Sequence, residues 1–565
     1  MTVKSLHDAR VTQAHLEVGQ TTIGRPVAIA LTAVFVVVIA AMPFSQAWSD
    51  PDVLRFPSAA GGDVGVIGHG AGEGERGSAP SLRTWVMTRN RDLLDRIQRF
   101  TDRLDDQSLL ARHLRPVVQL LLTRGASTGN ERVYIGRGGW LHYAADVQHL
   151  VGAGFLDDRQ LARRSATGGS LTNAPAPDPR PALLAFNAAL ARRGIRLVLL
   201  PTPVKAAIHP ERLGRTTVDA PVRNLSFARF ATEMRAAGAL LFDPAPLLAD
   251  LGATGEAAYL ARDTHWRPEA VVEVAHGLAR FLERETALPT REPTQLARRM
   301  VGVSNRGDTA GLLGLPDRWS PYPAERVEVR QVLTADGRPW RPDPSADVLL
   351  LGDSFSNIYS LDAMGWGDGA GLAAQLSLAL GRPVDSLVRN DAGAFATREA
   401  LAAELARGRD RLAGKRVLVY QFATRELSQG DWRLVDLEAP PAGPASMVLT
   451  PAPGQRLRVQ GRVRQRAPAP RPGSVPYRDH IIAIDLAEID VDGTAAAQNE
   501  ALVYLSSMED NVWTDAATLA VGQTITLTLR PWAEVAPDLD GINRAELVEG
   551  DVVFAEPWWG TLLEP

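Results

Sequence analysis

Short apolar runs alternate with amphipathic segments through the middle of the chain. The apolar runs cover residues 195–200, 240–243, 347–351, 386–389 and 416–422, and segments with helical spacing of apolar positions cover 182–193, 223–237, 369–380 and 396–407. Apolar runs of this length are typical of strands that are buried on both faces. Their alternation with helices predicts an α/β fold, in which helices flank a mostly parallel sheet.

The pattern changes on both sides of this region. Residues 49–80 are rich in Gly, Ala, Ser and Pro, which is typical of a flexible spacer. Beyond residue 440, Pro-rich stretches and short strand-like runs such as 480–491 predict a small, antiparallel β domain. We therefore assign an α/β domain to residues 81–440 and a β-rich domain to residues 441–565.

An uncharged apolar run lies near the N-terminus. Residues 27–48 carry no charge and are long enough to span a bilayer, and Arg10 and Arg25 precede them. This arrangement predicts a cytoplasmic segment at 1–26 followed by a transmembrane signal anchor at 27–48. A signal peptide cleaved near Ala47 is the alternative, although its basic region would be unusually long. Both interpretations export the rest of the chain.

Composition excludes several classes of function. The 565 residues include 61 basic and 65 acidic side chains, a formal net charge of −4, so no general basic field is available to recruit nucleic acid. The chain contains no Cys, which excludes disulfides, thiolate metal sites and a Cys nucleophile. No two His residues lie at ligand spacing beside carboxylates, so we expect neither a metal nor another cofactor.

A hydroxyl follows one of the predicted strands. The apolar run 348–351 leads directly into Gly-Asp-Ser at 352–354. Ligands of parallel sheets bind at the carboxyl ends of the strands, and Ser354 lies at such an end. Asp and Ser are also common turn residues, so this motif alone does not distinguish a nucleophile from a turn. A nucleophilic serine requires a base, which must come from elsewhere in the chain.

The sequence Asp-Thr-His-Trp at 263–266 supplies a candidate base. It comes just before a predicted helix that begins at Pro268. In an extended loop, side chains two residues apart point the same way, so Asp263 can orient His265 while the other ring nitrogen takes a proton from Ser354. A helix cap at Asp263 or Thr264 and a structural role for His265 are the alternatives. Together with the strand-end serine, the motif predicts a Ser–His–Asp triad.

The two motifs, GDSFS and DTHW, together resemble the SGNH hydrolase-like O-acetyltransferases of bacterial exopolysaccharides, the alginate O-acetyltransferase family AlgJ/AlgX. As in that family, the Asp-x-His motif precedes the serine motif. Other similar stretches are YIGRGGWLHY (134–143), RGDTAGLLGLP (306–316), NDAGAFATREAL (390–401) and VLVYQFATREL (417–427). The resemblance covers about residues 130–430.

The resemblance implies roles for particular residues. It implies an acetyl-enzyme on Ser354, with His265 as base and Asp263 as its orienter, and an oxyanion held by the amides of Ser354 and Gly393. Arg398 and Arg425 are candidates to contact an anionic sugar, with ordinary surface arginines as the alternative. The family pattern often reads Trp-Glu-Phe where this chain has Tyr-Gln-Phe at 420–422, which places any role of a carboxylate there in doubt.

Some family members carry a carbohydrate-binding module after the catalytic domain. The β-rich domain of this chain contains Trp513, Trp532, Trp558 and Trp559. An exposed Trp can stack on a sugar ring, whereas a buried Trp is ordinary core. We expect Trp558 and Trp559 to be substrate-binding residues, with core packing as the alternative.

The resemblance also implies a function. It implies a periplasmic O-acetyltransferase, anchored to the bacterial inner membrane, that acetylates hydroxyls of an exopolysaccharide such as alginate. The acetyl donor would be delivered by a membrane-bound O-acyltransferase. An SGNH carbohydrate esterase is one alternative, in which water replaces the sugar hydroxyl at the same triad. A non-catalytic polysaccharide-binding scaffold of a secretion complex is another.

Overall fold

The computed structural model of the protein describes Thr32 and residues 109–563, apart from gaps at 167–174, 215–219, 254, 391–392, 438–447, 474, 476, 497 and 548–550. Except for Thr32, the predicted anchor at 27–48 and the spacer at 49–80 lie outside the described residues. None of the helices described is both long and apolar enough to cross a membrane. The chain divides into two compact units, Met1–Val118 and Gln119–Pro565, and the fold and the site lie in the second.

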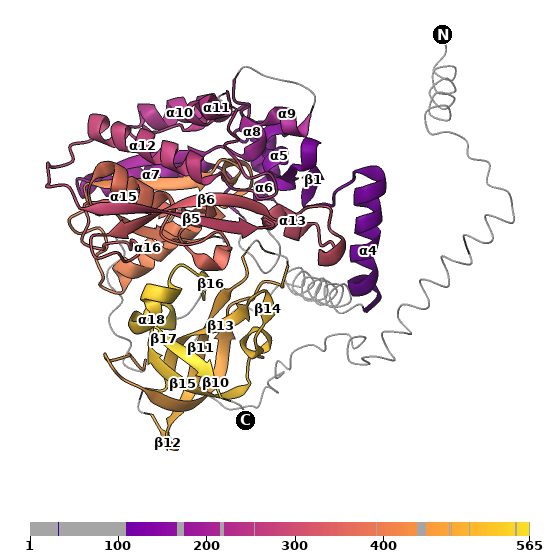
Figure 1. Ribbon diagram of the computed structural model, residues 1–565. Helices are drawn as coiled ribbons and strands as arrows, with labels where there is room; N and C mark the ends of the chain where they lie inside the picture. The colour runs from indigo at the N-terminus through magenta and orange to yellow at the C-terminus, as the bar shows by residue number, and fades with distance from the viewer. Residues whose placement is uncertain are drawn as a thin grey trace, which may run out of the picture. The chain divides into compact units, whose positions relative to one another are not determined.

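A parallel sheet forms the centre of the α/β region (Figure 1). Its strand order is β4-β3-β9-β7-β8, and every neighbouring pair is parallel. The strands are β3 (Arg196–Thr202), β4 (Leu240–Leu241), β7 (Val348–Gly352), β8 (Asp385–Val388) and β9 (Val417–Ala423). Every residue of β7 and β9 is buried, which is the reason that both read as continuous apolar runs. The predicted α/β class is confirmed.

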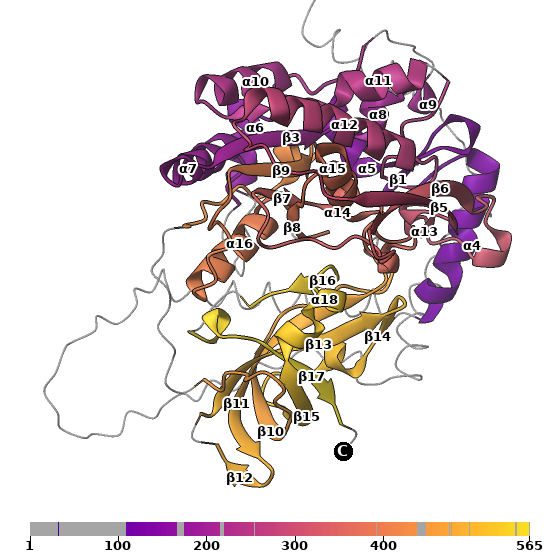
Figure 2. The same cartoon turned by 60° about the vertical axis from the view of Figure 1, so that its left-hand side comes forward.

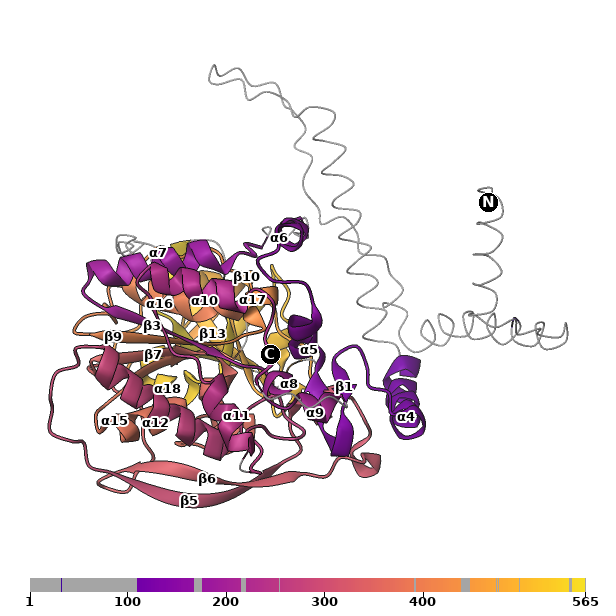
Figure 3. The same ribbon diagram turned by 90° about the horizontal axis from the view of Figure 1, so that it is seen from above.

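Helices cover both faces of this sheet (Figures 2 and 3). On one face α11 (Ala245–Ala253), α12 (Pro268–Glu285) and α15 (Leu372–Leu380) pack against alternate strand residues such as Val198 and Leu200. On the other face α7 (Pro179–Arg192), α10 (Phe227–Ala236) and α16 (Ala396–Ala406) pack against Leu197 and Leu199. Successive side chains of a strand point to opposite faces, so one buried strand serves two cores.

Two antiparallel ribbons flank the sheet. The first joins β1 (Val133–Ile135) to β2 (Leu141–Tyr143) through a glycine turn, as the sequence predicts. The second pairs β5 (Leu296–Asn305) with β6 (Glu325–Thr334), a ribbon that the sequence pattern does not predict. Most of β5 is exposed, and its apolar residues are interrupted by two arginines and a glycine, so it lacks the continuous apolar run of a buried strand.

A small β-barrel follows the α/β region. Strands β10 (Leu457–Arg466), β11 (His480–Val491), β13 (Glu500–Glu509), β15 (Thr524–Pro531) and β17 (Trp558–Leu562) form a ring that the pairing of β11 with β13 closes. The β-rich character of the C-terminal region is thus confirmed, and the closed barrel leaves these strands without a free edge. The boundary expected at residue 440 falls in the undescribed gap at 438–447.

The remaining elements are α4 (Leu109–Ala126), α5 (Ala144–Val151), α6 (Asp158–Ser165), α8 (Lys205–Ile208), α9 (Pro210–Leu213), α13 (Asp308–Leu312), α14 (Ser354–Asn357), α17 (Glu426–Gln429), α18 (Trp532–Leu539), β12 (Thr494–Ala495), β14 (Val512–Trp513) and β16 (Asn543–Ala545), with short 3₁₀ turns at Arg137–Gly139, Asp317–Trp319, Asp362–Met364, Gly393–Phe395, Asp515–Thr518 and Asp551–Phe554.

Candidate active site

Ser354 is the first residue of the short helix α14, directly beyond the carboxyl end of β7. The preceding Asp353 caps this helix, since its Oδ1 accepts a hydrogen bond from the amide of Phe355 at 2.9 Å. Its Oδ2 accepts a second bond, from the amide of Ala423 at 2.7 Å, which ties the turn to the end of β9. Ser354 is therefore held at the expected edge of the sheet, and it is only 3% exposed.

Gln421 supports the same turn from β9. Its Oε1 accepts hydrogen bonds from the amide of Asp353 at 3.0 Å and from Oγ of Ser356 at 2.7 Å. Its Nε2 donates to Oγ1 of Thr202 on β3 at 3.0 Å. The neutral amide thus both accepts and donates, which a carboxylate cannot do. At this departure from the family pattern, Gln421 buttresses the turn that carries Ser354.

Asp263 and His265 form a hydrogen-bonded pair. Nδ1 of His265 lies 2.6 Å from Oδ1 of Asp263, and both residues are 2% exposed. Oδ2 of Asp263 accepts hydrogen bonds from the indole of Trp366 and from the amide of Asp308, each at 3.0 Å. Arg267, not Asp263, is the N-cap of α12. The helix-cap alternative for Asp263 is therefore wrong, and its carboxylate orients the imidazole.

The electrostatics of the pair suit a base. Burial alone would raise the pKa of Asp263, but the imidazole of His265 and the hydrogen bonds to the carboxylate lower it to about 2. Burial likewise opposes the charged form of His265, yet the nearby carboxylates, first Asp263 and then Asp308, raise the pKa of the imidazole. Nε2 of His265 is buried and has no hydrogen-bond partner within the part of the chain that the structure describes. That nitrogen is available to take a proton.

The two motifs pack against each other. The rings of His265 and Phe355, the residue after Ser354, have centroids 4.9 Å apart. The indole of Trp266 donates to the carbonyl of Phe355 at 2.9 Å, and the hydroxyl of Tyr359 donates to the carbonyl of Trp266 at 2.7 Å. The structure therefore packs the loop of the predicted base and orienter against the turn of the predicted nucleophile, although 89 residues separate Trp266 from Phe355. No hydrogen bond joins Nε2 of His265 to Ser354 or to any other described residue.

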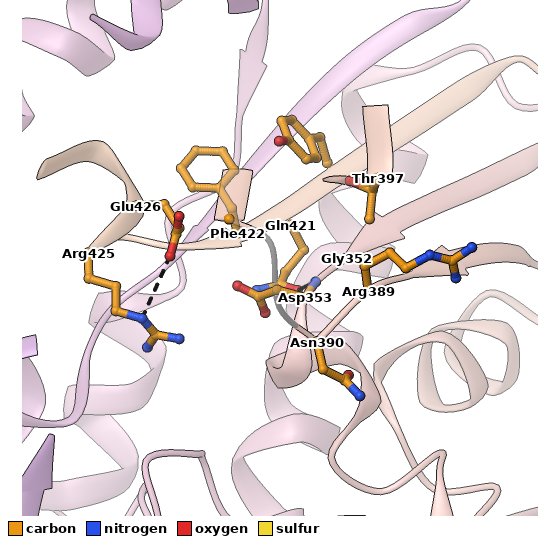
Figure 4. Close-up of a pocket in the computed structure, with 11 residues that line it drawn as sticks. Gly352, Asp353, Arg389, Asn390, Thr397, Gln421, Phe422, Arg425 and Glu426 are labelled. Atoms are coloured by element: carbon orange, nitrogen blue, oxygen red, sulfur yellow. Dashed lines mark hydrogen bonds and ion pairs between the residues drawn. The ribbon is translucent and has the colours of Figure 1, made fainter. Parts of the chain in front are cut away.

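A small cavity opens beside the Ser354 turn (Figure 4). Its volume is about 50 Å³, and it is lined by Gly352, Asp353, Arg389, Asn390, Gly393, Thr397, Tyr420, Gln421, Phe422, Arg425 and Glu426. Gly393 has a φ of +72°, a left-handed conformation that favours glycine. Gly393 thus lines the cavity next to the turn of Ser354, whereas Ser354, His265 and Asp263 are not among the lining residues.

The two predicted arginines differ in their surroundings. Arg425 lies at the cavity, where Nη1 donates to Oδ1 of Asp146 at 3.1 Å and the guanidinium lies 5.8 Å from the ring centre of Phe355. Arg398 is 1% exposed and donates to the carbonyl of Arg433 at 3.1 Å. Neither is a surface arginine, and of the two only Arg425 lines the cavity.

Several residues of the site carried no sequence signal. Trp366 and Asp308 contact Asp263 across long separations in the chain. Asn390 lines the cavity, and its Nδ2 is buried without a hydrogen-bond partner among the described residues. Asn390 and Asp308 lie within stretches that resemble the family, but no feature of those stretches distinguishes them from their neighbours.

The cluster of Asp263, His265 and Asp308 also has the residue types of a metal site. One ligand atom from each lies within 4.8 Å of the others. Two ligands bound to one tetrahedral zinc at about 2 Å lie roughly 3.3 Å apart. Nδ1 of His265 and Oδ1 of Asp263 are closer, at 2.6 Å, which is the separation of two atoms that share a proton. The arrangement as it stands fits a hydrogen bond better than a metal ion.

The tryptophans of the barrel are mostly part of its core. Trp558 is completely buried, and its indole donates to the carbonyl of Leu449 at 2.8 Å, so it offers no exposed face to a sugar. Trp559 is partly buried and lies 5.9 Å from the ring of Trp532. Trp513 is 41% exposed. Of the predicted pair, only Trp559 keeps an accessible ring.

Comparison with known proteins finds several that are similar to this chain. A probable alginate O-acetylase, AlgJ of Pseudomonas aeruginosa, is 34% identical over 172 residues, which is 29% of this chain and 42% of that protein, so the match spans less than half of the relative. The O-acetyltransferase domain of Pseudomonas putida AlgJ is 21% identical, with a TM-score of 0.40 over 52% of this chain and 92% of that one. Pseudomonas aeruginosa AlgX is 14% identical, with a TM-score of 0.37 over 71% and 90%.

The assignment rests on the family model rather than on these structures, whose TM-scores lie below 0.5. The model described as "SGNH hydrolase-like domain, acetyltransferase AlgX" matches residues 133–424, just over half of the chain. That range contains Asp263, His265 and Ser354. The chain therefore belongs to the family of AlgX-type SGNH hydrolase-like acetyltransferase domains.

Proposed function

We propose that this protein is an O-acetyltransferase that moves an acetyl group through Ser354 onto hydroxyls of an exopolysaccharide. One observation carries the proposal. The Asp263–His265 pair is packed against the turn of Ser354, and it keeps Nε2 of the imidazole without a hydrogen-bond partner among the described residues. A buried histidine that is oriented by a carboxylate and placed beside a strand-end serine is the arrangement that activates a hydroxyl.

The first half of the reaction loads the enzyme. Oγ of Ser354 attacks the acetyl carbonyl of the donor while Nε2 of His265 takes the hydroxyl proton. The amides of Ser354 and Gly393 stabilise the oxyanion of the tetrahedral intermediate. The intermediate collapses when the donor oxygen leaves with the proton from the imidazolium, and acetyl-Ser354 remains. Asp263 stabilises the imidazolium throughout and keeps its proton on Nδ1.

The second half reverses these steps with a sugar. A sugar hydroxyl gives its proton to Nε2 of His265 and attacks the acetyl carbonyl, and Ser354 leaves with that proton. Arg425 lines the cavity, but Asp146 and Glu426 already pair with it, so an anionic sugar such as a uronate of alginate would have to compete with these two carboxylates for its guanidinium. An esterase would admit water at the same step, so transfer requires that the acceptor be bound next to the acyl-enzyme.

The setting of the enzyme is part of the proposal. The uncharged run at 27–48 anchors the chain in the inner membrane and places the domain in the periplasm. A membrane-bound O-acyltransferase delivers the acetyl group to Ser354 from the membrane side. Edman sequencing of the purified native protein tests the anchor, because a mature N-terminus near Trp48 would show that the segment is cleaved.

Transfer is tested with a soluble acetyl donor, with and without candidate oligosaccharides. The wild-type chain is expected to give acetylated sugar by mass spectrometry, and Ser354→Ala is expected to lose about 10⁴-fold of the rate while keeping its circular dichroism spectrum. Ser345→Ala, an exposed serine in the loop before β7, is the matched control and should stay active. Acetate as the sole product with every acceptor would favour the esterase. A fully active Ser354→Ala would exclude Ser354 as the nucleophile.

A further inference from the structure

The turn at 306–308 packs directly on the loop that carries Asp263 and His265. Gly307 has a φ of +88°, and a Cβ added there would lie 2.2 Å from the carbonyl oxygen of Arg262. The close approach therefore requires glycine at this position. Beyond it, Asp308 begins α13 with its side chain 6% exposed. The function proposed above assigns no role to this buried acid.

Asp308 exchanges hydrogen bonds with the catalytic loop. Its amide donates to Oδ2 of Asp263 at 3.0 Å, and its own Oδ1 accepts from the amide of Thr264 at 2.7 Å. Its second oxygen, Oδ2, lies 3.7 Å from Nδ1 of His265. The imidazole thus has two carboxylates on the same nitrogen, one at hydrogen-bond distance and one slightly farther away.

We infer that Asp308 is a positioning residue for His265, which holds the Asp263–His265 loop in place and supplies a second negative charge that increases the basicity of the imidazole. This role deepens the proposed function and rests on it. Opposite charges within about 4–6 Å favour the charged form of each partner. A more basic imidazole removes the serine proton more effectively, at the expense of activity at low pH.

Other charged and titratable groups surround this cluster. They are Tyr143 of β2, Asp146 of α5, Lys205 of α8, Asp263 of the loop and Arg425 before α17. Lys205 is 1% exposed, and its Nζ donates to the carbonyls of Leu141 and Leu260 at 2.5 and 3.0 Å. This buried cation offsets part of the negative charge, so that two carboxylates can lie beside one histidine.

The charge of Asp308 is available at neutral pH. Burial and the neighbouring carboxylate of Asp263 raise the pKa of Asp308 to about 6, while the imidazole, the amide of Thr264 and Lys205 oppose that rise. Asp308 is therefore ionised in most molecules above pH 6 and acts on His265 there. Arg425 works in the opposite direction and lowers the pKa of His265.

The pKa of His265 can be measured without any substrate. The full-length chain is labelled at histidine, the imidazole signal of His265 is assigned from its loss in His265→Gln, and it is titrated by NMR. Asp308→Asn keeps an oxygen for the amide of Thr264 and removes the charge. We expect this substitution to lower the pKa of His265 by about one unit. The enzyme is also acylated with an activated acetyl ester over a range of pH. The acid limb of this pH–rate profile should move to lower pH by the same amount.

Two further variants make the test specific. Asp308→Glu keeps the charge and should bring the pKa of His265 back toward the wild-type value even where the rate falls. Asp317→Asn removes a carboxylate that is 90% exposed and pairs with Arg306, and it should leave the titration unchanged. A loss of rate without any shift in the pKa would reduce Asp308 to a purely structural residue.

The wild-type protein provides an independent check if Asp308→Asn does not fold. With two carboxylates on Nδ1, His265 should titrate above 6.5, the ordinary value for histidine. A pKa at or below 6.5 in the wild type, or an unchanged pKa in a folded Asp308→Asn protein, would overturn the inference. Because the titration needs no acetyl donor, a failed transfer assay would count against the proposed function and not against this role of Asp308.

Discussion

The indole of Trp266 donates a hydrogen bond to the carbonyl of Phe355, and this 2.9 Å contact joins the histidine loop to the serine turn. Each of these two residues is the sequence neighbour of a candidate catalytic residue, and both are completely buried. Their rings meet edge to face, with centroids 5.4 Å apart. The spacing of the His265 loop and the Ser354 turn therefore depends on a buried contact between a side chain and the backbone, not on residues that are open to solvent.

Replacing Trp266 with Phe should impair both stability and catalysis. The carbonyl of Phe355 would be left buried without its donor, which costs about 1–3 kcal/mol. A small displacement of the serine from its base should also lower kcat by about 10²-fold, with KM less affected. Stability is measured by denaturant unfolding and activity by acetyl transfer.

Trp558→Phe is the matched control for this change. It removes a similar buried indole hydrogen bond, to the carbonyl of Leu449 in the barrel. Stability should fall comparably, while acylation of Ser354 by a small acetyl ester should keep its rate. Equal losses of kcat in the two variants would show that the Trp266 contact has no special effect on the site.

The substitution Asp263→Asn should abolish most of the activity. The two carboxylate oxygens of Asp263 accept four hydrogen bonds, two at Oδ1 and two at Oδ2. An asparagine can accept at only one of these two positions, because its other side-chain atom is an NH₂ donor. It also leaves His265 free to take the wrong tautomer. We expect kcat to fall by about 10⁴-fold. The check is the acetylation rate of a variant whose thermal unfolding remains cooperative, and a rate within tenfold of wild type would contradict the orienting role.

Glycine substitutions test the close approach of the two loops. Gly307→Ala places a methyl group 2.2 Å from the carbonyl oxygen of Arg262 at a φ of +88°, so it should destabilise the protein by more than about 2 kcal/mol and reduce activity. Gly311→Ala, four residues later in α13, meets no atom within 4 Å and should be neutral or slightly stabilising. Similar melting temperatures for the two variants would argue against the packing at Gly307.

The pH dependence of stability should reveal the buried charge of Asp308. Its pKa is raised to about 6 in the folded protein, so its contribution to stability is fully present below its unfolded value near 3.8 and is lost as the pH rises through 6. Asp308→Asn mimics the protonated form. We therefore compare the free energies of unfolding of the variant and the wild type at each pH. We expect the difference in favour of the variant to be about 1–2 kcal/mol larger at pH 8 than at pH 4.5.

Melting curves of wild type and Asp308→Asn at the two pH values measure this difference. The exposed-site variant Asp317→Asn provides the baseline for removal of one carboxylate. A relative stability of Asp308→Asn that does not change with pH would show that the carboxylate is not held in a costly charged state. If Asp308→Asn is more stable than wild type at pH 8 and also has a lower pKa at His265, the charge of Asp308 favours catalysis at the expense of stability.

The sequence by itself determined how the five strands of the central sheet alternate with helices along the chain, although it did not reveal the ribbon of β5 and β6. Buried strands such as β7 and β9 are continuous apolar runs, and helices such as α7 and α12 have helical spacing and a proline in the first turn. These signals are local, because burial on two faces or on one face imposes a period on neighbouring residues. The same local logic placed Ser354 at a strand end and allowed Asp263 to orient His265.

Only the tertiary structure decided which distant groups complete the site. Asp308 and Trp366 reach Asp263 from segments 45 and 103 residues away, and no local period marks a polar side chain as a partner in such a contact. The structure alone also showed that Arg398 and Trp558 are buried. The type of a charged or aromatic residue does not reveal whether its side chain faces solvent or core. The barrel likewise closes through the pairing of β11 with β13. Such contacts depend on how the chain folds back on itself, because strand pairing and buried hydrogen bonds join residues that are far apart in sequence.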